Sequence, residues 1–235
     1  MNEILLIGTL VVLYGSVLLF YRLFGRLGLY CFSAAATILA NIEVLLLVDA
    51  FGMEMTLGNI LFATTFIVTD ILSETEGKEA AQKAVALGIA CSVLFLIINQ
   101  SWLYYVPSAG DWAAPSFHAI FESTPRMLLS SLAVYAVAQT ADVWLYHFWW
   151  DLTRKRFGDA RRFLWLRNNG STLVSQLINT VLFTLCAFWG TYDPSTIGSI
   201  ILSSYVIFIV TSLADTPTVY LARRIHDRAA AKAAQ

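Results

Sequence analysis

Seven long apolar stretches constrain the fold of this chain more than any other feature. A helix needs about 20 residues to cross the hydrocarbon core of a bilayer, and each stretch is close to that length. Lipid offers the backbone no hydrogen-bond partners, and the alternating pattern of a membrane β-barrel is absent, so helices are predicted. We expect an all-α, polytopic transmembrane helix bundle with about seven spans, at residues 4–21, 27–48, 57–76, 82–105, 126–148, 172–190 and 196–222.

The composition agrees with lipid as the solvent. Of 235 residues, 58% are hydrophobic and 13% are charged, and the mean hydropathy is +0.67. A soluble domain of this size could build its core with less apolar content. We therefore expect a single integral membrane domain over residues 1–235, with a basic C-terminal tail at about 223–235. The longest outer loop, at about 106–125, is expected to form a short interfacial helix or a lid.

The positions of Lys and Arg predict the orientation. With the N-terminus outside, Arg126 is the single residue of the fifteen Lys and Arg that does not fall in a cytoplasmic segment. Cytoplasmic loops of membrane proteins carry an excess of these residues, and one missed span would scramble the division. The sequence therefore predicts an N-out, C-in protein of the cell inner membrane. An alternative with six spans, in which residues 4–21 form a peripheral helix, stays open.

Polar residues recur at helical spacing inside the predicted spans. Gln139 and Asp142 share one helix face, and Gln176 and Asn179 share another. At about 1.5 Å per residue, Asp70, Asp142 and Asn179 lie roughly 8–12 Å above the cytoplasmic ends of their spans. Intramembrane ionisable residues usually face the bundle interior and mark ligand or ion pathways. We expect one polar cavity in the inner half of the membrane, although a single amide is also explained by a helix-to-helix hydrogen bond.

Aromatic residues complete this candidate site. Six Trp and Tyr residues lie near predicted interfaces, where most of them are expected to anchor the helices: Trp102, Tyr104, Tyr105, Trp149, Trp150 and Trp165. Tyr135 and Trp144 lie within a span and are the candidates to contact a ligand. The candidate substrate-binding residues are therefore Asp70, Gln139, Asp142, Gln176, Asn179, Tyr135 and Trp144.

Acidic residues and a proline mark a candidate mouth or gate for this cavity. Glu74 ends the span at 57–76, and the C-terminus of a helix disfavours an anion. Pairing with Lys78 or Lys83, just beyond, would offset this cost. In the last span Asp215 lies beside Pro217, which is predicted to kink the helix. The candidate gate residues are Glu74, Asp215 and Pro217.

Signatures of an enzyme, a metal site or a cofactor site are missing. The three histidines are scattered, and there is no nucleophile elbow, phosphate loop or HExxH motif. Cys31, Cys91 and Cys186 lie inside apolar runs and are interpreted as inert. We expect no catalytic or metal-binding residues, no cofactor and no nucleic-acid partner. A remote alternative is an intramembrane enzyme that uses two aspartates as an acid–base pair.

Four segments resemble the bacterial queuosine precursor transporters, also called the vitamin uptake transporter family. They are TDILSETEGKEAA (69–81), QTAD (139–142), RNNGSTLVSQLINT (167–180) and DTPTVY (215–220). The resemblance covers about residues 27–225, and the first and third segments are the most specific.

The resemblance implies import of a small-molecule deazapurine, 7-cyano-7-deazaguanine, 7-aminomethyl-7-deazaguanine or a related base, for tRNA queuosine synthesis. The predicted site suits such a base, since a carboxylate can accept its paired N–H donors and an amide can donate to its carbonyl. The main alternative is a substrate-binding subunit that needs a separate energising module. The lipid bilayer is the other expected partner, and a homodimer is compatible with the sequence.

Overall fold

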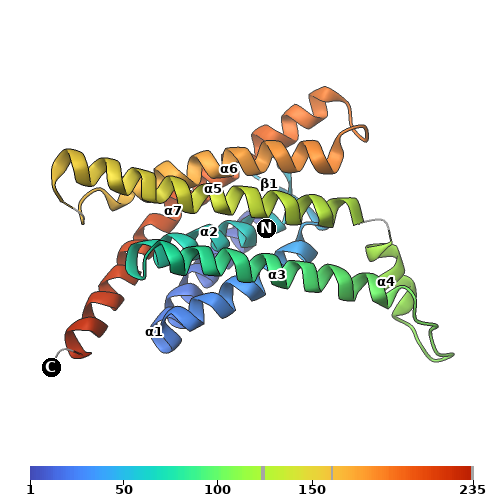
Figure 1. Ribbon diagram of the computed structural model, residues 1–235. Helices are drawn as coiled ribbons and strands as arrows, with labels where there is room; N and C mark the ends of the chain where they lie inside the picture. Colours follow the sequence, from blue (N-terminus) through green and yellow to red (C-terminus); the bar gives the residue numbers. More distant parts are fainter. Residues whose placement is uncertain (123–124, 160, 234–235) are drawn as a thin grey trace.

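The structure, a computed structural model, describes residues 1–122, 125–159 and 161–233. It is a bundle of long helices (Figure 1), which confirms the predicted all-α membrane fold class at this level. Five of the described helices are long and apolar enough to cross a membrane. The helices are α1 (Asn2–Glu43), α2 (Gly58–Thr75), α3 (Lys78–Trp102), α4 (Ala114–Phe121), α5 (Pro125–Phe157), α6 (Leu164–Phe188) and α7 (Pro194–Ala233).

Helix α1 consists of two helical halves that fold back on each other at Gly25. This residue has φ 58° and ψ −143°, a conformation that favours glycine. In a straight helix Phe20 and Phe32 would be about 18 Å apart, yet their ring centroids are 5.7 Å apart. The two halves correspond to the predicted stretches 4–21 and 27–48.

A β-hairpin follows α1, and it differs from the prediction that residues 27–48 are one helical span. The helix ends at Glu43, and β1 (Leu47–Ala50) pairs antiparallel with β2 (Met53–Thr56). The two turn residues, Phe51 and Gly52, both have positive φ, as a two-residue hairpin turn of type I′ requires. Hydropathy does not separate an apolar strand from the end of an apolar helix, so this hairpin was missed.

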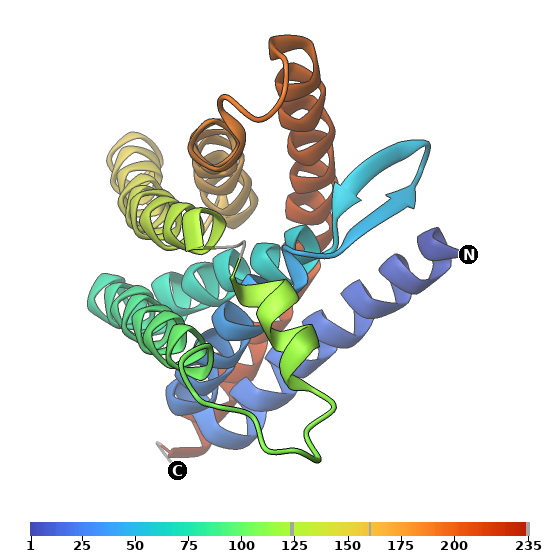
Figure 2. The same cartoon turned by 90° about the vertical axis from the view of Figure 1, so that its right-hand side faces the viewer.

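Helix α2 lies at the centre of the bundle, in contact with α1, α3, α5 and α7. Figure 2 shows the other helices around it. Fourteen of its eighteen residues are buried, and it is not among the five helices that hydropathy marks as membrane-spanning. Because protein rather than lipid surrounds it, α2 can carry Asp70 and several threonines. Gly77, at φ 91°, ends α2 and turns the chain into α3.

The segments predicted to be cytoplasmic gather at one end of the bundle, on the left of Figure 1. There the hydroxyl of Tyr21 lies 3.0 Å from Nδ1 of His226 and 3.4 Å from a carboxylate oxygen of Glu76. Arg161, in the α5–α6 loop, pairs with Asp227 of α7. These contacts join four segments that are far apart in the sequence.

The opposite end carries the hairpin, α4 and the α6–α7 loop. Helix α4 lies in the segment expected to form a short interfacial helix or lid. At the start of α7, the Asp193 carboxylate accepts backbone N–H bonds from Ser195 at 3.0 Å and Thr196 at 3.1 Å, and Pro194 fits the first helical position. Hydrogen bonds from the Ser195 hydroxyl, and then from Thr196, hold the pKa of Asp193 well below its usual range.

Helices α5 and α6 extend past the predicted membrane spans. The predicted spans 126–148 and 172–190 left an inner loop at 149–171. This connection is much shorter in the structure, because α5 continues to Phe157 and α6 begins at Leu164. Residues 167–169 are therefore helical and point into the bundle, where all three are buried. Charged residues lower the hydropathy of a segment without ending the helix, and for this reason the sequence placed them in a loop.

Candidate functional site

Three buried aspartates form a layer across the bundle, which we call the carboxyl layer: Asp70 of α2, Asp142 of α5 and Asp215 of α7. Their exposed fractions are 0%, 0% and 2%. Helix α6 faces all three and supplies hydroxyl and amide donors. Since a buried carboxylate is costly unless it is compensated, the partners of each aspartate decide what the layer can do.

Asp142 is held by hydroxyl groups. One carboxylate oxygen accepts a hydrogen bond from Ser175 at 2.7 Å, and the other lies 3.5 Å from the Thr69 hydroxyl, at the limit for a hydrogen bond. The Thr69 hydroxyl also lies 3.2 Å from Oε1 of Gln139, whose amide donates to Thr65 at 2.6 Å. Gln139 and Asp142 therefore share the predicted face, and that face packs on α2.

Asp70 and Asp142 contact neighbouring positions of α6, since Thr172 binds the first and Ser175, three residues further on, binds the second. Thr172 donates a hydrogen bond to one oxygen of Asp70 at 3.0 Å, while the other oxygen, Oδ1, has no donor. One turn along α6 from Thr172, Gln176 is also buried, and its Oε1 has no donor either. The carboxyl layer thus keeps unused acceptor capacity.

Asp215 accepts a hydrogen bond from the side-chain amide of Asn168 at 2.7 Å. The neighbouring Asn169 donates to the Thr216 hydroxyl at 2.8 Å, next to Pro217. The two asparagines were not among the predicted site residues, although they lie in the segment 167–180 that carries the resemblance. They join α6 to α7 where a proline leaves a backbone carbonyl without its usual donor.

Glu74 is the centre of an ion-paired cluster, which we call the Glu74 cluster. It lies at the end of the bundle where the segments predicted to be cytoplasmic gather. Arg167 donates to both carboxylate oxygens, at 3.0 and 2.9 Å, and Arg223 lies 3.1 Å from one of them. Tyr146 donates its hydroxyl to Glu74 at 2.7 Å, and the Arg167 guanidinium lies over the Trp150 ring at 4.3 Å.

The cluster corrects the pairing expected from the sequence. Among the described residues, the ion-pair partners of Glu74 are Arg167 and Arg223 rather than Lys78 and Lys83. The lysines are next to Glu74 in sequence, but Gly77 turns the chain and leaves both of them exposed. The cluster ties α2, α5, α6 and α7 together, and so it closes this end of the bundle.

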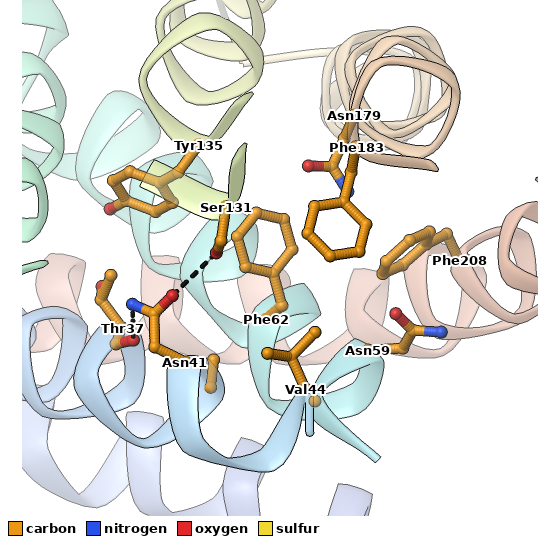
Figure 3. Close-up of a pocket in the computed structure, with 12 residues that line it drawn as sticks. Thr37, Asn41, Val44, Asn59, Phe62, Ser131, Tyr135, Asn179, Phe183 and Phe208 are labelled. Atoms are coloured by element: carbon orange, nitrogen blue, oxygen red, sulfur yellow. Dashed lines mark hydrogen bonds between the residues drawn. The ribbon is translucent and has the colours of Figure 1, made fainter. Parts of the chain in front are cut away.

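A small pocket lies on the other side of the carboxyl layer (Figure 3). Four aromatic rings and three asparagines, among other residues, line it: Phe62, Tyr135, Phe183, Phe208, Asn41, Asn59 and Asn179. The space for water-sized molecules is about 40 Å³, enough for a few waters. Phe62 packs on Tyr135, with ring centroids 5.8 Å apart, and on Phe208, at 6.5 Å. We call it the aromatic pocket.

A wide cavity of about 910 Å³ lies beyond the aromatic pocket, at the hairpin end. The β-hairpin, α4 and the adjoining ends of α5, α6 and α7 line it. Val44 borders both spaces, and Asn59 of the pocket donates a hydrogen bond to Ser204 of the cavity at 3.4 Å. Wide cavity, aromatic pocket, carboxyl layer and Glu74 cluster therefore follow one another through the bundle.

The structure divides the predicted site residues among these layers. Asp70, Gln139, Asp142 and Gln176 are buried in or beside the carboxyl layer, while Tyr135 and Asn179 line the aromatic pocket. Trp144 contributes neither to the carboxyl layer nor to the aromatic pocket. Its side chain is 56% exposed and stacks on Phe148 at the outer surface of the bundle. Phe62 was missed, since one aromatic residue among many in a span carries no signal of its own. The sequence left the role of Asn41 open, and the structure places it in the aromatic pocket.

The carboxyl layer is not arranged as a metal centre. Within the described residues, no group of three His, Cys, Asp or Glu side chains is placed to hold a metal ion. What the arrangement offers is hydrogen-bond acceptors in a dry interior, next to a pocket of flat apolar rings. With five helices long and apolar enough to cross a membrane, these features are those of a multi-pass membrane protein with polar groups inside its helix bundle.

Comparison with known proteins assigns the family. Residues 56–222 match the family described as "Putative vitamin uptake transporter", and the chain belongs to this family. It is 38% identical over 209 residues to the "Probable queuosine precursor transporter" of Bacillus subtilis, covering 89% of each chain. It is 27% identical over 154 residues to the "Queuosine precursor transporter" of Escherichia coli, covering 66% of this chain and 64% of that one. No solved structure gives a significant match.

Proposed function

We propose that this protein imports a queuosine precursor, a 7-deazaguanine such as 7-cyano-7-deazaguanine or 7-aminomethyl-7-deazaguanine, for tRNA queuosine synthesis. The names of the two relatives support the substrate class. The observation that carries the proposal is the position of the aromatic pocket directly against a layer of buried carboxyl and amide groups.

The chemistry of the site matches a guanine-like base. Such a base has adjacent ring N–H and amino donors, which a carboxylate accepts in parallel, and a carbonyl that needs a donor. Asp142 supplies the acceptor, and the amides of Asn179 and Gln176 supply donors. The rings of Phe62, Phe183 and Phe208 supply flat apolar contact. The rings must move apart to admit the base, since the present space is about 40 Å³.

We further propose seven spans with the N-terminus outside and the C-terminus in the cytoplasm of the inner membrane. The two halves of α1, together with α2, α3, α5, α6 and α7, make the seven. In this orientation the wide cavity opens to the outside and the Glu74 cluster closes the cytoplasmic side. Opening of this cluster would then accompany release of the substrate into the cell.

Uptake by the purified chain in liposomes tests this function. Wild type should take up radiolabelled 7-cyano-7-deazaguanine without any added subunit. Asn179→Ala should weaken binding, while Leu177→Ala, on the lipid-facing side of the same helix, should leave it unchanged. Uptake that requires a second protein would favour the subunit alternative, and a covalent change of the base would favour an enzyme.

A further inference from the structure

Several acceptors in the carboxyl layer have no donor. Three buried side chains each present an oxygen without a donor: Oδ1 of Asp70, Oδ1 of Asn168 and Oε1 of Gln176. Their exposed fractions are 0%, 0% and 1%. Buried polar atoms almost always find a partner, and of these oxygens the one on Asp70 can be satisfied by binding a proton.

Two of these oxygens belong to α6, and the third belongs to Asp70 of α2, which contacts that helix through Thr172. Asn168 and Gln176 lie four residues before and after Thr172, on the same face of α6. Thr172 is the residue that donates to Asp70. The Asn168 amide is oriented by its bond to Asp215, which fixes its nitrogen as the donor and its oxygen as the unsatisfied atom. Of these three residues, Asp70 alone carries an ionisable side chain.

The two adjacent carboxyl groups differ in their partners. Asp142 has hydroxyl groups from Ser175 and Thr69 at its two oxygens, whereas Asp70 has Thr172 alone. Hydroxyl donors stabilise the ionised form of Asp142. Two negative charges side by side in an apolar interior repel each other strongly. One proton on the free oxygen of Asp70, donated to Asp142, removes this repulsion and satisfies the orphaned atom.

The basic side chains on the surrounding helices have other partners or lie at the surface. Arg167 and Arg223 are engaged by Glu74, and Lys78 and Lys83 of α3 are exposed at the cytoplasmic end. The titratable and charged groups around the pair on the helices packed against it are Tyr14 of α1, Glu74 of α2, Tyr146 of α5, Arg167 of α6, and Asp215 and Arg223 of α7.

We propose that Asp70 binds the coupling proton of this transporter, and that this proton enters the cell together with the substrate. The proton comes from water on the outer side, is shared with Asp142, and leaves to the cytoplasm when the Glu74 cluster opens. No group of three His, Cys, Asp or Glu side chains in the described part of the chain is placed to hold a metal ion, whereas a single carboxyl group is enough to bind a proton. The proposal rests on the proposed import function.

The pair explains why proton and substrate would travel together. With one proton on Asp70, Asp142 remains an acceptor for the N–H donors of the base. Without the proton the pair carries two charges, and with a second proton Asp142 ceases to be an acceptor. The substrate therefore binds best to the singly protonated pair, and two ligands that favour the same state are positively coupled.

The protonated acid can be detected without any substrate. Infrared difference spectra of wild type against Asp70→Asn, in lipid at neutral pH, should contain the C=O stretching band of a protonated carboxylic acid in wild type alone. Asp151→Asn, an exposed aspartate on α5, is the matched control and should leave the band in place. Absence of the band in wild type overturns the proposal whatever the substrate is.

Coupling is measured with 7-cyano-7-deazaguanine in liposomes. For wild type, the affinity should fall by about tenfold per pH unit on the alkaline side, as linkage to one proton requires. An inside-alkaline pH gradient should drive accumulation. In Asp70→Asn the affinity should be independent of pH and the gradient should drive no accumulation, although exchange of labelled for unlabelled base stays measurable. Asp70→Glu should restore the pH dependence.

These experiments distinguish failure of the proposed import function from failure of the proposed proton site. If wild type neither binds nor exchanges the base, the import function is wrong. If exchange is intact but accumulation ignores the pH gradient, follows a sodium gradient, or persists in Asp70→Asn, the import function stands and the proton site is wrong.

Discussion

At the scale of single residues, Glu74 shows how a buried carboxylate in an unfavourable position is stabilised by its partners. It lies at the C-terminal end of α2, where the helix dipole disfavours an anion, and its side chain is 3% exposed. Two guanidinium groups and a tyrosine hydroxyl compensate it. Removing a partner from such a cluster leaves a buried charge, which costs far more than the net contribution of the intact pair.

Arg167→Met should therefore destabilise the protein by about 3–5 kcal/mol, the usual cost of breaking a buried ion pair. Denaturant unfolding in mixed micelles measures this. The double variant Glu74→Gln with Arg167→Met should be less destabilised than Arg167→Met alone, because the uncompensated charge is gone. Arg154→Ala, at an exposed position of α5, serves as the control. Equal loss in the single and double variants would show that Arg167 acts through packing instead.

Asp142→Asn should weaken binding of the deazaguanine by about 2–5 kcal/mol, as other breaks in buried charged hydrogen bonds do. The amide would replace an acceptor oxygen by an N–H group facing the donors of the base. Calorimetric titration of the purified variant against wild type and Asp151→Asn measures the loss. If a folded Asp142→Asn protein binds the base with unchanged affinity, then the base is bound by other residues of the bundle.

At the scale of helices, the fold-back of α1 depends on one backbone conformation. Gly25 adopts φ 58° and ψ −143°, and nothing lies within 4 Å of the position where a side chain would begin. Backbone strain rather than crowding would therefore oppose any other residue there. Gly15, inside the first half of the same helix, also has open space but ordinary helical geometry.

Gly25→Ala should destabilise the protein by about 1–3 kcal/mol, the cost of a strained backbone conformation. Gly15→Ala should be neutral or slightly stabilising, because alanine favours a helix. Thermal unfolding in detergent compares the two variants directly. If both behave alike, the fold-back does not depend on the backbone freedom of Gly25.

Helix α7 offers a second prediction at this scale. Pro217 lies inside α7, which continues without a break to Ala233, and a kink at Pro217 stays a prediction. Pro217→Ala restores an N–H that can bond the preceding turn, so the helix should become stiffer. We expect the exchange rate to fall more than the affinity for the base. A parallel loss of rate and affinity would indicate that Pro217 shapes the binding site itself.

At the scale of the whole molecule, the two ends of the bundle differ in charge and in closure. The end with the Glu74 cluster holds the turn at Gly25, the α2–α3 junction, the α5–α6 loop and the end of α7. The other end holds the wide cavity. With an excess of Lys and Arg at the closed end, the positive-inside rule predicts that this end faces the cytoplasm.

A reporter fused to the C-terminus should therefore be active in the cytoplasm. A thiol-reactive, membrane-impermeant label should reach Ser108→Cys, in the α3–α4 loop, from outside intact cells. The same label should reach Arg161→Cys, in the α5–α6 loop, only after the cells are permeabilised. A C-terminal reporter on the outer side would reverse the assignment of cavity and closure.

The sequence by itself determined the membrane fold class, the approximate ranges of the helices and the polar faces of α5 and α6, because hydropathy and helical spacing are local properties. The motif at 69–81 also indicated the family. The sequence could not determine which side chains pair, because this depends on the rotation and depth of each helix against its neighbours. Thus Glu74 pairs with Arg167 and Arg223, 93 and 149 residues away, instead of with the adjacent lysines. Trp144 turns outward for the same reason, and the predicted single cavity divides into a carboxyl layer and an aromatic pocket.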